Sequence, residues 1–313
     1  MDQKLVSIAM ATYNGAAYLK LQLDSIIAQT YKNIEIIICD DCSSDGTVKI
    51  LEEYCLNRNI RYYVNEKNLG YIKNFEKVLG YCSGDFIALA DQDDIWLENK
   101  VEFLVNNIGD STLIFSDSCL IDEQGELLAK SYLKHQNIDI PGSAGQLNRL
   151  MFCNYVTGCT VLFKRDILEK AFPFIDTISH DWWIALHASI NGGIASVNTP
   201  LVLYRQHPGN TIGAEKFNIR KIFRIIRKVN TRRLKVINEC DRLCRISECL
   251  KSRYENFKDL DRVAEIERDL FIYRKSLMKK TPLHLNAFLI AWKYRKCWFD
   301  NHPEICALAK LIV

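Results

Sequence analysis

Apolar and polar positions follow two alternating periods along the first ninety residues. Short, nearly continuous apolar runs predict strands, and apolar positions spaced by about 3.6 residues predict helices between them. The expected strands are 5–11, 34–39, 60–64 and 86–90, and the expected helices are 18–27, 48–56 and 74–82. The second run is apolar on both faces, which is typical of a central parallel strand. This alternation predicts an α/β fold with a mostly parallel sheet flanked by helices.

The pattern loosens after about residue 110. We expect strands at 113–115, 155–163 and 201–204, a hairpin at 120–128, a polar loop at 132–145, and helices at 166–171 and 180–190. From residue 215 onward the chain contains no glycine, and helical periodicity dominates. The sequence therefore predicts an α/β domain at 1–214 and a helical C-terminal region at 215–313.

The formal charge divides at the same position. Residues 1–214 contain 17 basic and 26 acidic side chains and residues 215–313 contain 24 and 12, although the whole chain has a net charge of only +3. Such asymmetry indicates different partners for the two segments, with nucleic acid or an anionic membrane surface as candidates for the basic one. A hydrophobic content of 48% with six prolines excludes disordered and fibrous classes.

Targeting signals and disulfides are not expected. The first fifteen residues lack a charged leader followed by an apolar run, and no apolar stretch approaches the roughly 20 residues that a membrane span needs. The twelve cysteines are scattered, which favours reduced thiols, and the Cys39-x-x-Cys42 pair lacks the second half of a zinc site. We therefore expect a cytoplasmic protein.

Polar loops follow three of the predicted strands. They are Thr12–Gly15, Asp40–Thr47 and Asp91–Asp94. Ligands of open α/β sheets bind beyond the carboxyl ends of the strands, so we expect the three loops to form one crevice.

The third loop places Asp91, Asp93 and Asp94 within four residues. Carboxylates this close repel one another, and a hard divalent cation such as Mg²⁺ or Mn²⁺, shared with phosphate oxygens, would relieve the repulsion. The alternative is a helix N-cap with solvated charges. The Asp40–Asp41 pair is placed to bind a ribose or base edge, or it belongs to an acidic turn.

Two histidines and two tryptophans add further candidates. In the pair His180–Asp181 the carboxylate is a candidate general base, with helix capping as the alternative. His207 is a candidate metal ligand or a surface histidine. Trp182 and Trp183 have flat faces suited to sugar rings, whereas core packing is the more common role of tryptophan.

Taken in order, these segments resemble the inverting family-2 glycosyltransferases of the GT-A fold. The resemblance covers about residues 4–213 and is carried by ATYNG, CDDCSSDGT, ALADQDDIW, VTGCTVLF, SHDWW and YRQHPGNTIG. The combination of DDxSxDGT with a later DxD is highly specific. The forms ALADQDDIW, NLGYIKNFEKVL and RQHPGNTIG are more similar to the branch that includes bacterial rhamnosyltransferases of O-antigen, capsule and rhamnan assembly.

The resemblance implies roles by position. The implied contacts to the nucleotide-sugar are Thr12, Tyr13, Asn14, Asp40, Asp41, Lys73, Asp91 and Gln92. The implied metal ligands are Asp93 and His207, the implied catalytic base is Asp181, and the implied acceptor side is Gly158, Trp182 and Trp183. Many relatives have Glu-Asp where this chain has His180–Asp181. Many also have Ala-Arg-Asn at residues 74–76, which leaves Lys73 as the nearest basic substitute.

The implied activity is a metal-dependent, inverting, non-processive transfer of a sugar. The donor would be a dTDP- or UDP-sugar, and the acceptor would be a hydroxyl of a glycan. The resemblance also implies that this glycan is linked to a lipid. Processive relatives carry membrane spans and a QxxRW segment, neither of which this chain shows. A rhamnosyltransferase, a hexosyltransferase that uses a UDP-sugar, and a non-catalytic module on the same fold that binds a nucleotide-sugar or a glycan stay open as alternatives.

The basic region suggests a surface partner. Residues 216–235 contain nine lysines and arginines and no acid, with apolar residues at helical spacing over 219–229. This pattern predicts a helix lying on anionic lipid, and residues 292–299 form a second basic, aromatic cluster. Packing on the catalytic domain or on a second copy of the chain is the alternative. No nucleic-acid motif is present, so we expect a peripheral protein on the cytoplasmic face of the inner membrane.

Overall fold

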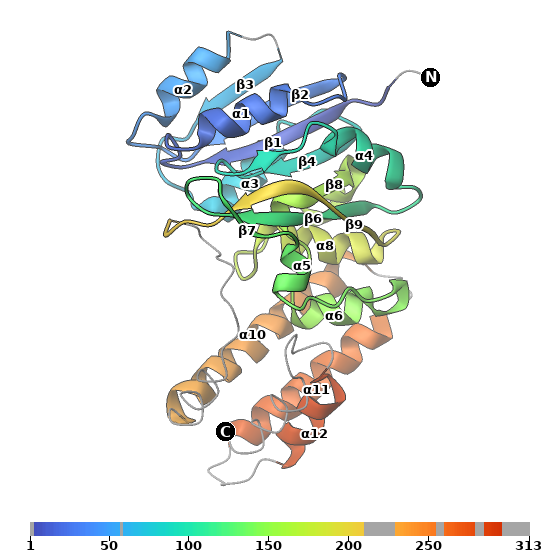
Figure 1. Cartoon of the computed structure of the whole chain (residues 1–313). Helices are drawn as coiled ribbons and strands as arrows, with labels where there is room; N and C mark the ends of the chain where they lie inside the picture. The colour runs from blue at the N-terminus through green and yellow to red at the C-terminus, as the bar shows by residue number, and fades with distance from the viewer. Residues whose placement is uncertain (1–2, 57–58, 210–228, 255–259, 279–284, 296–313) are drawn as a thin grey trace. The chain divides into compact units, whose positions relative to one another are not determined.

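The computed structural model describes residues 3–56, 59–209, 229–254, 260–278 and 285–295 (Figure 1). The chain divides into two compact units. The first unit comprises residues 1–135 and 156–214, and the second unit comprises residues 136–155 and 215–313. The sequence predicted a boundary near residue 214 but did not predict that residues 136–155 join the C-terminal region.

The first unit is built on a nine-stranded sheet, with strand order β3-β2-β1-β4-β8-β6-β9-β5 and β7 paired to β6. The strands are β1 (Val6–Thr12), β2 (Ile34–Asp40), β3 (Ile60–Val64), β4 (Phe86–Ala90), β5 (Ile95–Trp96), β6 (Leu113–Ile121), β7 (Leu127–Ala129), β8 (Val161–Lys164) and β9 (Ile194–Arg205). The first four strands in sequence are parallel, and β6 is parallel to β9. The pairings β4–β8, β6–β8, β5–β9 and β6–β7 are antiparallel, so the sheet is mixed beyond β4.

Helices cover both faces of this sheet (Figure 1). They are α1 (Leu19–Ile27), α2 (Thr47–Tyr54), α3 (Tyr71–Leu79), α4 (Lys100–Asn107), α5 (Tyr132–His135), α7 (Leu168–Ala171) and α8 (His180–Ile190). Apolar side chains of α1, α2 and α4 pack with alternate residues of β1, β2 and β4 in one core. Successive side chains of a strand point to opposite faces, and α3 packs against β1 and β2 and also contacts α8.

The second unit is helical over the residues described. Its helices are α6 (Gln146–Phe152), α10 (Val229–Arg253), α11 (Leu260–Met278) and α12 (Leu285–Lys293). Buried apolar side chains from all four helices form its interior, for example Leu150, Leu243, Ile266 and Ile290. Residues 219–228 of the predicted membrane-binding helix and most of the basic run at 216–235 lie outside the described residues, as do residues 296–299 of the second cluster.

The α/β class, the first four strands, the hairpin and α8 confirm the expectations from periodicity. Three details were wrong. The expected strand at 155–163 begins only at Val161, because Gly158–Thr160 form a 3-10 turn. The expected polar loop at 132–145 contains α5, and β9 begins at Ile194 instead of Leu201.

Candidate active site at the carboxyl ends of the parallel strands

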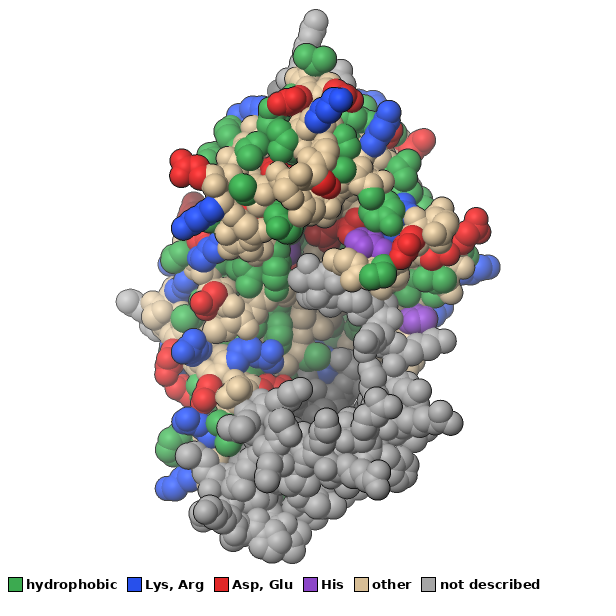
Figure 2. All heavy atoms as spheres, turned by 90° about the vertical axis from the view of Figure 1, so that its left-hand side faces the viewer, with side chains coloured by type: hydrophobic (Ala, Val, Ile, Leu, Met, Phe, Trp, Pro, Cys, Tyr) green, Lys and Arg blue, Asp and Glu red, His purple; other side chains and the backbone are tan. Residues whose placement is uncertain are grey.

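The loops that follow β1, β2 and β4 lie at one edge of the sheet, because these three strands are adjacent and parallel. A backbone hydrogen bond from Asp41 N–H to the carbonyl of Thr12 (2.8 Å) extends the β1–β2 pairing into the loops. On the face shown in Figure 2, acidic and histidine side chains of this unit lie next to one another. The convergence that the sequence predicted is therefore present.

Asp40 binds groups of its own protein. Its carboxylate accepts hydrogen bonds from the Thr12 hydroxyl (2.8 Å), the Ser43 N–H (2.8 Å) and the Ser43 hydroxyl (2.6 Å). Its side chain has no solvent exposure. Asp40 and Thr12 together therefore fix the loop after β2 relative to the end of β1.

The loop after β1 is tied to the start of α2. The Asn14 N–H donates to the Ser43 hydroxyl, and the Asn14 side-chain oxygen accepts from the Ser44 N–H, both at 2.8 Å. Asn14 adopts φ +48°, a left-handed conformation that asparagine tolerates better than most residues. The Gly15 N–H donates to the Thr47 hydroxyl (2.8 Å). Tyr13 and Asn14 are both exposed in this loop, and 48% of the Tyr13 surface is accessible.

Gln92 connects the acidic loop to the loop after β1. Its side-chain oxygen accepts from the Tyr13 N–H (2.8 Å), and its side-chain N–H donates to the Tyr13 carbonyl (3.1 Å). A Cβ atom on Gly15 would lie 2.2 Å from the Gln92 oxygen, so a larger residue there would displace the Gln92 side chain. The position predicted to contact the nucleotide-sugar therefore also fixes the spacing of the two loops.

Asp41 is equally buried but orders a different segment. One carboxylate oxygen accepts from the Asn65 amide and the Leu69 N–H, and the other accepts from the Gly70 N–H, all at 2.8 Å. Gly70 has φ +81° and ψ 153°, a conformation that is essentially restricted to glycine. Asp41 therefore sets the chain direction into α3.

Lys73, the predicted basic contact, binds protein groups in this structure. Its ammonium donates to the Glu76 carboxylate (2.5 Å) and to the Phe174 carbonyl (3.1 Å). Lys77, which the sequence did not single out, donates to the Asn65 side-chain oxygen (2.7 Å) and is thereby linked to Asp41. A contact of Lys73 with a nucleotide stays a prediction.

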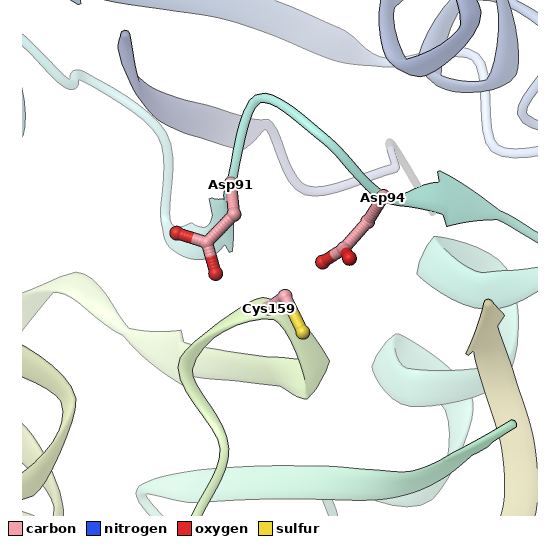
Figure 3. Close-up of side chains that lie close together, drawn as sticks. All are labelled: Asp91, Asp94 and Cys159. Atoms are coloured by element: carbon pink, nitrogen blue, oxygen red, sulfur yellow. The ribbon is translucent and has the colours of Figure 1, made fainter. Parts of the chain in front are cut away.

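Asp91 and Asp94 converge on Cys159 (Figure 3), and the ligand atoms of the three side chains all lie within 4.8 Å of one another. Asp94 is fully buried and accepts from the Arg205 N–H (3.0 Å). Burial raises the pKa of Asp94, and the Asp93 charge raises it further. Burial and the charges of Asp94 and Asp93 also raise the pKa of Asp91 well above its ordinary value. Without a bound cation, the charged forms of Asp91 and Asp94 are therefore disfavoured.

Lys100, the first residue of α4, is a buried cation beside this group. Its ammonium donates to the Cys159 carbonyl (2.6 Å) and lies 3.1 Å from the centre of the Trp96 ring. Burial lowers the pKa of Lys100, while the charges of Asp94 and Asp91 oppose this shift. Sequence reasoning missed Lys100, and the signal that could have indicated it was the group of carboxylates six to nine residues before it.

Asp93 forms a hydrogen bond with His207. Asp93 Oδ2 and His207 Nε2 are 2.9 Å apart, and both side chains keep about one-seventh of their surface exposed (14% and 15%). Two ligands at right angles on an ion with bonds of 2.0–2.1 Å lie about 3 Å apart. The two atoms hydrogen-bond to each other in this structure, and a carboxylate oxygen and an imidazole nitrogen at this spacing are also donors that a divalent cation can bind. The structure therefore brings together the two residues predicted as metal ligands.

Asp181 lies in the first turn of α8, and one of its oxygens accepts from the Trp182 N–H (2.8 Å). A Cβ atom on Gly158 would lie 3.4 Å from the Asp181 Cβ and 3.4 Å from His180 Nε2. Gly158, the predicted acceptor-side residue, is therefore next to the predicted base.

His180 is buried beside the base. Its ring stacks on Phe75 with 3.7 Å between centroids, and neither ring nitrogen has a hydrogen-bond partner among the residues described. Burial lowers the pKa of His180 to about 4. The imidazole is therefore neutral near pH 7.

The two tryptophans fill the interior. Trp183 has no exposed surface and donates from its ring nitrogen to the Ala171 carbonyl (2.8 Å), and Trp182 is 9% exposed. Trp183 takes the core-packing role that the sequence left open, and the small exposed part of Trp182 limits any contact with a sugar. Contact of Trp183 with a sugar ring would require α8 to move.

This fold and this site place the chain in a class: a glycosyltransferase of the GT-A fold, with carboxylates at the strand ends, a hydrogen-bonded Asp93–His207 pair and a carboxylate beside a glycine turn. The family model of glycosyl transferase family 2 matches residues 7–172. The chain belongs to that family, and the protein is a glycosyltransferase.

Two curated relatives illustrate the family. The chain is 30% identical over 217 residues to the UDP-Glc:alpha-D-GlcNAc-diphosphoundecaprenol beta-1,3-glucosyltransferase WfaP of Escherichia coli, covering 68% of this chain and 82% of that protein. It is 32% identical over 221 residues to the dTDP-rhamnosyl transferase RfbG of Shigella flexneri, covering 66% and 74%.

Solved structures share the fold at low sequence identity. Residues 1–349 of TarS from S. aureus, in complex with UDP-GlcNAc, match with a TM-score of 0.56 at 16% identity, covering 98% of this chain and 90% of that one. The mannosyltransferase PcManGT from Pyrobaculum calidifontis, in complex with GDP-Man and Mn²⁺, matches with a TM-score of 0.50 at 16% identity, covering 98% and 84%.

Proposed function

We propose that the protein transfers one sugar per encounter from a nucleotide diphosphate donor to a hydroxyl of a lipid-linked glycan in bacterial surface polysaccharide synthesis. The observation that carries this proposal is the arrangement at the strand ends, where the Asp93–His207 pair and Asp181 lie in one family-2 fold. The relatives' names support the acceptor class, since one acts on a diphosphoundecaprenol-linked sugar.

Asp181 is the proposed base. A carboxylate beside the acceptor hydroxyl can take its proton as the oxygen attacks the anomeric carbon. Gly158 leaves space next to Asp181, because any larger residue would place a Cβ against it. A single displacement of this kind inverts the anomeric configuration.

Asp93 and His207, with Asp91 beside them, are the residues that would hold Mg²⁺ or Mn²⁺. When bound, such an ion supplies positive charge where the diphosphate leaving group develops negative charge. The residues of this chain contribute geometry: the Arg205 N–H and guanidinium hold the acidic loop through Asp94 and the Asp93 carbonyl. Gln92 sets the distance to the loop that carries Tyr13.

The donor is proposed as a dTDP- or UDP-sugar. Among the relatives, one is named for UDP-glucose and another for dTDP-rhamnose. The RQHPGNTIG and ALADQDDIW segments favour rhamnose as the transferred sugar. Transfer of a hexose from a UDP-sugar is the alternative.

Association with an anionic membrane surface is part of the proposal. Residues 215–313 have twice as many basic as acidic side chains, and a lipid-linked acceptor lies at a membrane. None of the helices in the described ranges is long and apolar enough to cross a bilayer. Sedimentation with anionic but not with neutral vesicles is expected, and equal sedimentation with both would contradict electrostatic binding. Self-association through the C-terminal helices is the competing use of this surface.

The test of the activity is a screen of the purified protein against UDP-, GDP- and dTDP-sugars with Mn²⁺, measuring binding and slow hydrolysis of the donor. Binding of one donor with sugar transfer to a lipid-diphosphate-linked glycan is expected. Binding with neither transfer nor hydrolysis would indicate a non-catalytic module instead.

The Asp181→Asn variant tests the base. Transfer is expected to fall by about 10²–10⁴-fold, because the amide cannot take a proton. The dissociation constant of the donor and the unfolding midpoint should stay near the wild-type values. Near-full transfer by the folded variant would exclude Asp181 as the base.

A further inference from the structure

Tyr71 stands at the edge of the site without an assigned role. It is the first residue of α3, and 39% of its surface is exposed. Its hydroxyl makes no hydrogen bond to the described residues. A tyrosine with an exposed ring and an unengaged hydroxyl is suited to contact with a polar ligand that also has an apolar face.

The fold holds Tyr71 in place from the N-terminal side. The two preceding N–H groups, of Leu69 and Gly70, both donate to the buried Asp41 carboxylate at 2.8 Å. Gly70 then takes the glycine-type conformation, with φ +81°, that turns the chain into α3. The buried Asp41 carboxylate therefore orders the backbone that leads into Tyr71.

A second support lies on the other side of the ring. The His180 ring lies edge-on to Tyr71 with 6.0 Å between centroids and an interplanar angle of 72°. His180 in turn stacks on Phe75, which lies one turn beyond Tyr71 on the same face of α3. The three rings form a continuous aromatic cluster that ends at an exposed member.

This cluster adjoins the proposed base. His180 precedes Asp181 directly, and Gly158 contacts both residues. The Asp181 charge is close enough to raise the pKa of Tyr71, together with the larger effect of partial burial. Asp181, Tyr71 and the space beside Gly158 therefore belong to one local region.

We infer that the Tyr71 ring contacts the acceptor sugar, packing against the apolar C–H surface of the pyranose whose hydroxyl faces Asp181. The inference rests on the proposed function and adds a substrate-contacting residue to it. The acceptor is favoured over the donor because the group that must approach Asp181 is the acceptor hydroxyl. Rigid support by Asp41 and His180 means that little ordering is needed when the sugar binds.

The experiment measures steady-state transfer to a synthetic α-GlcNAc diphosphate that carries a short lipid, with the donor identified by the screen. Tyr71→Ala is expected to raise the acceptor KM about tenfold. The donor KM and the rate of donor hydrolysis should change less than about twofold. Tyr71→Phe and Tyr71→Trp should restore an acceptor KM near the wild-type value, because they keep the ring.

Tyr81 provides a matched control. It lies just beyond the other end of α3, stacks on Tyr63 with 4.1 Å between centroids, and is 38% exposed, close to the 39% of Tyr71. Tyr81→Ala should leave both KM values unchanged. A loss of activity caused only by weaker folding of α3 would appear in both alanine variants.

Three outcomes would overturn the inference alone, in a wild-type protein that transfers sugar. They are an unchanged acceptor KM in Tyr71→Ala, a change confined to the donor KM, and a Tyr71→Phe variant as defective as Tyr71→Ala. If the wild-type protein binds donor but transfers sugar to no lipid-diphosphate acceptor, the proposed function fails and this inference fails with it.

Discussion

Two groups of aspartates follow β2 and β4, the strands that flank β1, and the two groups differ in their hydrogen-bond partners. Asp40 and Asp41 at the end of β2 accept six hydrogen bonds from their own protein. The carboxylates after β4 instead face one another, and burial raises the pKa of Asp91 and Asp94. The same residue type is thus structural where N–H and O–H donors surround it and is poised for a ligand where they do not.

The largest effect is expected from Asp93, a partly exposed member of the second group. Asp93→Ala should lower transfer about 1,000-fold, since it removes a carboxylate proposed to hold the metal ion beside the leaving group and costs about 4 kcal/mol of transition-state stabilisation. The free energy of unfolding of Asp93→Ala should differ from that of the wild type by less than about 1 kcal/mol, because removing this charge relieves its repulsion with Asp91 and Asp94. The measurement is kcat/KM with Mn²⁺, alongside urea unfolding. Activity within tenfold of wild type would place Asp93 among the structural carboxylates.

Asp41 should show the reverse pattern. In Asp41→Asn, one carboxylate oxygen becomes an amide N–H₂ that cannot accept from the Leu69 or Gly70 N–H. The free energy of unfolding is expected to fall by about 3 kcal/mol, the cost of buried donors left without an acceptor. Urea unfolding checks this, with Asp93→Asn as the matched charge change. Equal stability of the two variants would remove the distinction between the groups.

His180 extends the comparison to a buried group whose ring nitrogens have no hydrogen-bond partner in the described part of the chain. Its pKa in the folded protein is about 4, below the ordinary 6.5, so between these values the unfolded chain binds a proton that the folded one does not. Stability therefore falls as the pH is lowered through this window, by about 2 kcal/mol between pH 7 and pH 5 for this group.

The variant that isolates this effect is His180→Phe, which keeps a ring against Phe75. Its free energy of unfolding should decline by about 2 kcal/mol less than that of the wild type over the same pH interval. A His135→Gln variant controls for the loss of one histidine and should retain the wild-type slope. Parallel wild-type and His180→Phe curves would mean that His180 is protonated in the folded protein.

Periodicity predicted the first four strands because each is a short apolar run bounded by polar loops, and the loops then had to converge at one edge. The Asp93–His207 pair was predictable from the resemblance alone, because 114 residues separate the two in sequence. Periodicity contains no information about such pairs.

Other features depend on tertiary burial that local sequence does not encode. Lys100 looks like a solvated residue at a helix start, and only the packing of α4 places its ammonium against Trp96 and the Cys159 carbonyl. Tyr71 looks like an ordinary helical aromatic until Asp41 and Gly70 orient it. Residues 136–155 carry no compositional mark that separates them from the domain on either side.

That inserted segment has a practical consequence for dissecting the protein. The chain passes from one unit to the other three times, at residues 135–136, 155–156 and 214–215. Deleting everything after residue 214 would leave α6 without α10, and the side chains of Leu147, Leu150 and Met151 would lose the helices of their own unit. A soluble minimal catalytic fragment would therefore need either the whole chain or a redesigned 136–155 segment. A single protease cut near residue 214 would not yield two self-sufficient pieces.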